Sequence, residues 1–270
     1  MTSDSDPVRH WNSLTSAEAT RRANENPVVV LPLAATEHHG PHLPLSTDID
    51  ISRGLLAEAF RHLELDLPVW ALPTQGVGAS LEHVRFDGTE SVAAEQLVET
   101  ICHLGRNVAL SGVRRLVVSN SHGGNHAPIE TAALRLREER DMLVVKASYY
   151  QFTRPKDVDL PESEWRYGLH GGAIETAMML HLCPENVRKD HVTRFWSFAE
   201  ELDQEKFRIT PTGAAAFAWL AGDLNPSGAV GDATLATAEI GQRLVTHYAA
   251  MLADVIRDAS RFPIDRLTPR

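Results

Sequence analysis

An unbroken apolar run, from Val28 to Leu31, leads straight into the stretch from Pro32 to Asp50, which reads PLAATEHHGPHLPLSTDID. A run without a polar position favours a strand that is covered on both faces, as in the parallel sheets of α/β proteins. The stretch after it gathers ionisable side chains within fourteen residues: Glu37, His38, His39, His42, Asp48 and Asp50. Carboxylates and imidazoles at this density suit a divalent ion such as Zn²⁺, Mn²⁺ or Fe²⁺. Since open α/β sheets bind ligands at the carboxyl ends of their strands, we expect a metal site there.

Strand-like and helix-like patterns alternate along the rest of the chain, which favours βαβ units and a mainly parallel sheet. The expected strands cover residues 28–33, 68–73, 115–119 and 142–148. The expected helices cover residues 15–24, 49–62, 91–107, 128–140 and 234–259, and Ser91 is expected to cap the third. We therefore predict one α/β domain over residues 11–262, a disordered N-terminus over 1–10 and a C-terminal tail over 263–270.

Composition narrows the partners of this domain. The formal net charge is −10, from 36 acidic and 26 basic residues, which argues against binding to nucleic acid or to an anionic membrane surface. No segment has 18 uninterrupted apolar residues, and the N-terminal residues contain no apolar signal segment. Cys102 and Cys183 both stand in apolar surroundings, where they are expected to be buried free thiols of a reducing compartment. We therefore expect a cytoplasmic protein with a small-molecule substrate.

Two further segments bring candidate ligands to the same edge of the sheet. His122 follows the strand at 115–119 and is itself followed by Gly123 and Gly124. His170 precedes two glycines and a helix whose first turn carries Glu175, so both side chains can point toward one cleft. Taken alone, Glu175 is equally well explained as a charge that complements the helix dipole.

Six motifs occur along the chain in this order: TEHHGPHLPLSTD (36–48), GxSxEH (78–83), FDGT (86–89), NSHGGN (120–125), HGGAIET (170–176) and SGAVGDATLAT (227–237). On these motifs the chain resembles the creatininase family, also called creatinine amidohydrolases. The resemblance covers nearly the whole sequence. It implies a single three-layer α/β/α sandwich with a mainly parallel sheet, two divalent metal ions per subunit (Zn, Mn or Fe) and assembly as a homohexamer.

The same resemblance implies roles for six residues. Asp48 is the family position that bridges the two ions, with Glu37 and His122 completing one site. His39 would complete the other site with Glu175, because Gly123 and Gly124 occupy the positions just after His122 where creatinine-hydrolysing members carry a ligand. His170 holds the family position of the general acid that protonates the leaving nitrogen. Its alternative reading is a buried histidine that hydrogen-bonds behind the site.

The substrate is less constrained than the metal site. Creatinine-hydrolysing members hold the ring with a Trp and an Asp, and Arg166 and Tyr167 stand at those positions here, so creatinine is a doubtful substrate. Glu82 and His83 are equally compatible with a solvated pair in a Gly-rich loop. The candidates for substrate binding are Ser80, Glu82, His83, Arg166, Tyr167 and Trp219.

The expected function is metal-dependent hydrolysis of a C–N bond, other than an ordinary peptide bond, in a small, possibly cyclic, amide. Two alternatives lie within the family, a formamide deformylase and a peptidase-like enzyme. A third is a metal-dependent enzyme that acts on an anionic sugar or phosphate, with Arg166 pairing the anion. The segment 213–232 contains Phe217, Trp219 and Leu220 among small residues, which predicts a subunit contact in a hexamer.

Overall fold

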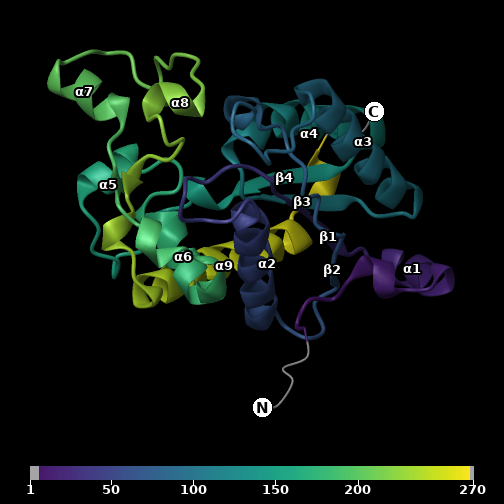
Figure 1. The fold of residues 1–270 in the computed structure, drawn as a ribbon. Coiled ribbons are helices and arrows are strands. Elements are labelled where there is room, and N and C mark those ends of the chain that lie inside the picture. The colour runs from purple at the N-terminus through teal and green to yellow at the C-terminus, as the bar shows by residue number, and fades with distance from the viewer. Residues whose placement is uncertain (1–5, 268–270) are drawn as a thin grey trace.

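A four-stranded parallel sheet forms the centre of the computed structural model, which describes residues 6–267 (Figure 1). Its strands, in the order β2-β1-β3-β4, are β1 (Val28–Leu33), β2 (Val69–Ala71), β3 (Arg115–Asn120) and β4 (Leu143–Ser148). All three pairings are parallel, so the carboxyl ends of the strands lie at one edge. Leu33 pairs with Asn120, which brings the last residues of β1 and β3 level with each other.

Strand β1 accounts for the apolar run that precedes the stretch of candidate ligands. Val28 and Val30 point into the hydrophobic core on one face of the sheet. Val29, Leu31 and Leu33 point into a second core on the opposite face. Because both faces are covered, the alternation of side chains along the strand leaves no position for a polar residue.

Helices cover both faces of the sheet (Figure 1). One layer consists of α2 (Thr47–His62), α6 (Ala173–Leu182) and α9 (Ala238–Arg261). The opposite layer consists of α3 (Ala94–Leu110) and α4 (His126–Arg140). This is the predicted three-layer α/β/α sandwich with a mainly parallel sheet.

The strand order places a switch point between β1 and β3. The chain leaves β1 toward α2 on one face, and it leaves β3 toward α4 on the other. The loops after these neighbouring strands therefore diverge, and a crevice opens at the carboxyl ends, where α/β proteins bind their ligands.

Shorter elements surround this core. They are α1 (Ser16–Ala23), α5 (Glu162–Tyr167), α7 (Phe198–Gln204), α8 (Ala221–Leu224), and the antiparallel pair β5 (Arg194–Phe195) and β6 (Gly231–Asp232). Residues 196–224, which include α7 and α8, form an arm that projects away from the sheet at the upper left of Figure 1. No helix was expected at α5 or α8, and the predicted strand at 68–73 forms pairs only at Val69–Ala71.

Several local expectations change in the structure. Ser91 does not cap α3, which begins at Ala94; instead the Gln96 side chain accepts the backbone N–H of Ala93 at 3.1 Å, and Ser91 Oγ accepts that of Ser80. Cys102 is buried as predicted, whereas Cys183 is only partly buried.

The predicted chain ends fall partly outside the described residues, because residues 1–5 and 268–270 are not described. Within the described part, Ala71 donates its backbone N–H to Arg9 at 2.8 Å, so the segment before α1 pairs with the sheet edge. The domain boundaries otherwise stay a prediction. Within residues 6–267, no helix combines the length and apolar character that crossing a membrane requires.

Candidate active site

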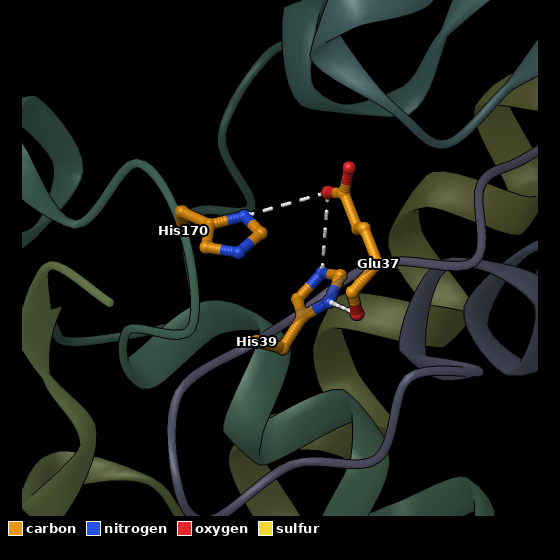
Figure 2. A group of neighbouring side chains, drawn as sticks. All are labelled: Glu37, His39 and His170. Carbon is orange, nitrogen blue, oxygen red and sulfur yellow. Dashed lines mark hydrogen bonds and ion pairs between the residues drawn. The ribbon is translucent and has the colours of Figure 1, made fainter. Parts of the chain in front are cut away.

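The carboxylate of Glu37 lies at the centre of the crevice. Its segment follows β1, and the carboxylate is buried. One oxygen, Oε1, faces nitrogens of four imidazoles, at 3.1 Å from His122, 3.7 Å from His83, 3.7 Å from His170 and 3.9 Å from His39. Figure 2 shows two of these rings, His39 and His170, directed at the same oxygen of Glu37.

Three of these histidines are oriented by backbone carbonyl groups. His39 donates from Nδ1 to the carbonyl of Glu37 at 3.1 Å, and His122 donates from Nε2 to that of Ala79 at 3.0 Å. His170 donates from Nε2 to the carbonyl of His38 at 2.7 Å. Each bond leaves the other ring nitrogen facing the carboxylates, where it can hold a proton or bind a metal.

Asp48 links the two sides of the crevice. It lies in the first turn of α2, with Oδ1 at 3.3 Å from Nε2 of His39 and Oδ2 at 3.3 Å from Nδ1 of His122. Ser121, directly after β3, donates its hydroxyl to the backbone carbonyl of Asp48 at 2.9 Å. The start of α2 is therefore tied to the loop that carries His122.

Three groups of donor atoms in the described chain are close enough to hold an ion, with all atoms of a group within 4.8 Å of one another. They are Glu37 with Asp48 and His122, His39 with Asp48 and Glu175, and Glu37 with His39 and His170. The first two groups share Asp48. Oε2 of Glu37, Nε2 of His39 and Oδ2 of Asp48 are buried without a hydrogen-bond partner. Unpaired buried atoms of these types are costly, and divalent ions would satisfy them, so the residues fit a metal centre.

Glu175 supplies the carboxylate that the segment after His122 lacks. Its Oε2 accepts the backbone N–H of Gly171 at 2.7 Å, and its Oε1 lies 3.4 Å from the hydroxyl of Tyr149, which donates to it. At Gly124 a Cβ atom would lie 2.2 Å from the carbonyl oxygen of Ala79, so no side chain can be placed there. The structure therefore brings the predicted alternative, Glu175, to the centre.

Charges within the centre shift several pKa values. Burial raises the pKa of Glu37, but the neighbouring His122 outweighs this effect and holds the pKa well below its usual range. Burial lowers the pKa of His39, but Asp48 reverses the shift and raises the value to about 10. Burial and the charge of His39 both lower the pKa of His170 well below its usual range. The clustered carboxylates thus attract positive charge, and a bound cation would replace the proton on His39.

A cavity of about 740 Å³ opens above these residues. Of the residues predicted to bind substrate, Glu82, His83 and Trp219 line it. Trp219 is also fixed by a hydrogen bond from its indole N–H to the carbonyl of Pro211 at 2.9 Å.

The other three predicted substrate residues do not line the cavity. Ser80 is buried beneath it, with its hydroxyl 3.2 Å from Nε2 of His122. Arg166 forms an ion pair with Asp203 at 2.8 Å, and Tyr167 is buried on another side of α5. Since successive residues of a helix point about 100° apart, α5 can present only part of this segment to the cavity.

Four residues that the sequence analysis overlooked do line the cavity: Tyr149, Tyr150, Arg154 and Trp165. Tyr149 and Tyr150 directly follow β4, so their position at the carboxyl end of a parallel strand was a usable signal. Trp165 immediately precedes Arg166, and no sequence pattern distinguishes which of the two faces the cavity.

The fold and the site together define a metal-binding α/β hydrolase. A family model described as creatinine amidohydrolase (creatininase) matches residues 12–256. The mycofactocin precursor peptide peptidase of Mycobacterium tuberculosis (strain CDC 1551 / Oshkosh) is 34% identical over 92% of this chain and 91% of that protein. The creatinine amidohydrolase of Pseudomonas putida is 33% identical over 61% of this chain and 68% of that protein. The chain belongs to the creatininase family, and it is an amidohydrolase.

Solved creatininase structures have the same fold. A manganese form matches with a TM-score of 0.76 at 25% identity, over 97% of this chain and 100% of that chain. A mutant creatininase of Zn-Zn type matches with a TM-score of 0.73, also at 25% identity and over the same shares. These similarities confirm the predicted fold class and family.

Proposed function

We propose that this chain hydrolyses an amide bond in a substrate of peptide size at a centre of two divalent ions bridged by Asp48. The observation that carries the proposal is that Asp48 belongs to two donor groups at the floor of one cavity. A carboxylate shared in this way matches the geometry of two-metal hydrolytic sites.

In this proposal, Glu37 and His122 hold one ion together with Asp48, and His39 and Glu175 hold the other. The manganese and Zn-Zn creatininase structures support Mn²⁺ or Zn²⁺ as the metal. Two such ions would supply a water of lowered pKa and positive charge opposite the amide oxygen.

In this proposal, His170 transfers the proton from the attacking water to the departing nitrogen. Its Nε2 is occupied by the hydrogen bond to the carbonyl of His38, so Nδ1 is the atom that exchanges protons in the crevice. Burial lowers the pKa of His170, which favours a neutral ring before the reaction. Nδ1 can then accept the proton of the attacking water and deliver it to the departing nitrogen.

The size of the cavity favours a peptide-like substrate over creatinine. A volume of about 740 Å³ lies in the range of pockets that enclose drug-sized ligands, and a creatinine ring would leave most of it empty. The 34% identical peptidase, which covers nearly the same length, supports the same choice. Among the alternatives drawn from the sequence, the peptidase-like enzyme is therefore preferred.

The test loads the purified chain with Mn²⁺ or Zn²⁺ and follows two readouts: the release of amino groups from short N-acylated peptides and formamides, and the conversion of creatinine to creatine. We expect turnover of a peptide amide that stops when a chelator removes the metal. Creatinine turnover with a kcat/KM equal to or above that of every peptide would contradict the proposed substrate class.

We further propose a cytoplasmic homohexamer, built through the arm that follows β5. Phe217, Trp219 and Leu220 are half-buried rather than exposed, so they do not provide the apolar surface that the sequence predicted. Neighbouring residues of the arm are exposed instead: Trp196, Phe198, Phe207 and Ile209. Large apolar side chains gathered on one arm support a subunit contact there.

A further inference from the structure

One basic side chain lines the cavity together with several acidic ones. Arg154 is the only Arg or Lys among the described residues that line it. Four carboxylates line the same cavity: Glu37, Asp48, Glu82 and Glu175. The cavity thus has an acidic floor and a single guanidinium elsewhere on its wall.

Arg154 is held in place by its surroundings. The carbonyl of the preceding Thr153 accepts a hydrogen bond from Nε2 of His247 on α9 at 2.7 Å, and the following Pro155 is buried. The guanidinium carbon lies 5.0 Å from the centre of the Trp165 ring, which also lines the cavity. A stacked guanidinium loses less freedom when it binds a planar anion, because its orientation is already restricted.

The present partner of Arg154 is a weakly held carboxylate. Nη1 donates to Oε2 of Glu162 at 2.6 Å, yet the side chain of Glu162 is 75% exposed and that of Arg154 is 47% exposed. Exposed ion pairs contribute little to stability, so a ligand can displace Glu162.

We propose that Arg154, stacked on Trp165, forms a subsite for a carboxylate group of the amide substrate, and that Glu162 occupies this subsite until the substrate binds. This inference rests on the proposed function, which places the scissile amide beside Asp48. It adds that the substrate carries a carboxylate away from the scissile bond, as a peptide with a free C-terminus does.

Arg154 lines the same cavity as Asp48 and Glu175, with Tyr149 and Tyr248 also in its wall. Tyr149 donates to Glu175 at 3.4 Å, and its ring centre lies 5.4 Å from that of Tyr248. A substrate that reaches both the proposed metal centre and Arg154 has to occupy a cavity of about 740 Å³, which suits a short peptide better than a single small ring.

The charge distribution favours a carboxylate over a phosphate. Glu162 already shows that the guanidinium pairs with a carboxylate in this position. A phosphate carries about −1.5 to −2 charges at pH 7, and the single guanidinium would balance only part of that charge.

Arg166 provides a matched control in the same chain. It also forms an ion pair, with Asp203 at 2.8 Å, and its guanidinium carbon lies 5.1 Å from the centre of the Tyr167 ring. Its side chain is 51% exposed, close to the value for Arg154, but it does not line the cavity. A general effect of removing a stacked, ion-paired arginine would appear in both variants.

The experiment titrates the metal-loaded protein by calorimetry with three probes. These are N-acetylglycylglycine, its C-terminal amide, and N-acetyl-O-phosphoethanolamine, which carries a phosphate in place of the carboxylate. We expect the free acid to bind about 10- to 100-fold more tightly than the amide, the range for a charge-assisted pair. Arg154→Gln should abolish this preference, Arg166→Gln should retain it, and Glu162→Gln should increase affinity for the acid severalfold.

Other outcomes overturn the inference. If the wild type does not prefer the acid, the subsite does not exist. If Arg154→Gln keeps the preference, the carboxylate binds elsewhere, for instance to the metal ions. Tighter binding of the phosphate probe than of the acid, lost in Arg154→Gln, would assign the guanidinium to a phosphate instead.

The carboxylate subsite and the proposed reaction can each fail without the other. Hydrolysis of peptide amides without a carboxylate preference would overturn only the subsite. An Arg154-dependent preference, with metal bound but no amide hydrolysed, would support the subsite and overturn the proposed reaction.

Discussion

Nδ1 of His122 lies 3.1 Å from Oε1 of Glu37, although the two residues follow different strands. The contact depends on the register of β1 and β3, which ends both strands at the same level of the sheet. Both side chains are buried and Oε2 of Glu37 has no hydrogen-bond partner, so the buried carboxylate must be balanced by a proton or by a cation.

The first prediction concerns the shared carboxylate. Asp48→Ala should remove metal from both donor groups and abolish turnover, because no other side chain in the described site belongs to both of those groups. Asp50→Ala is the matched control, since Asp50 lies in the same turn of α2 but accepts a hydrogen bond from Ser46 instead. Metal content is measured by plasma emission alongside kcat. Full metal content with normal turnover in Asp48→Ala would refute the assignment of the centre.

A second prediction separates the possible roles of His170. His170→Asn should keep both metals bound and lower kcat by about 10² to 10⁴, the range for a lost general acid. The surface residue His103, on α3, gives the control variant His103→Asn. Loss of metal in His170→Asn would instead make His170 a ligand, as the group with Glu37 and His39 allows. If the metal is retained and kcat is unchanged, another residue delivers the proton to the leaving nitrogen.

The third prediction concerns Glu164, which holds the segment of His170 in place. Its buried carboxylate accepts the backbone N–H groups of Ala173 and Asp232, both at 2.6 Å. Glu164→Ala leaves both N–H groups without their acceptor and should lower the free energy of unfolding by about 2 to 4 kcal/mol. The exposed Glu162 provides the control, and Glu162→Ala should change it by less than about 0.5 kcal/mol. Urea unfolding measures both, and equal small effects would show that Glu164 has no such role.

A fourth prediction concerns stability in acid. Burial lowers the pKa of His42 to about 4, and its Nε2 lies 2.9 Å from the hydroxyl of Thr176. The unfolded chain takes up this proton near pH 6.5 but the folded chain only near pH 4, so stability is lost as the pH falls through that window. By pH 5 the contribution of His42 is a loss of about 2 kcal/mol.

This loss is measured as a difference between proteins. Urea unfolding at pH 7.5 and pH 5.0, in metal-free protein, should show that the wild type loses about 2 kcal/mol more than His42→Gln. Titration of the other histidines occurs in both proteins and cancels. An equal loss in both would show that His42 takes up its proton in the folded chain at its ordinary pKa.

The fifth prediction concerns assembly. Sedimentation equilibrium at micromolar concentration should give about 180 kDa, six copies of the 29.8 kDa chain. Replacing Trp196 and Phe207 by Ser should shift the distribution toward smaller species, because both side chains are exposed on the projecting arm. A monomer of about 30 kDa in the wild type would rule out the proposed contact.

The sequence by itself determined the features that depend on local order along the chain. The apolar run of β1 required a strand covered on both faces, and the spacing of apolar residues in α9 required a helix packed on one side. Glu37 and His122 each follow a strand, and parallel strands bring such positions to one edge of the sheet. The candidate ligands were therefore accessible before any contact was known.

The tertiary structure alone decided which side chains meet in the cavity. Glu175 reaches the centre because α6 packs beside α2, and Gly124 cannot carry a ligand because the carbonyl of Ala79 fills that space. In α5, Trp165 faces the cavity whereas Arg166 turns to Asp203. A rotation of about 100° between neighbouring helical residues decides this difference, and it is set by packing against distant segments that leave no trace in the local sequence.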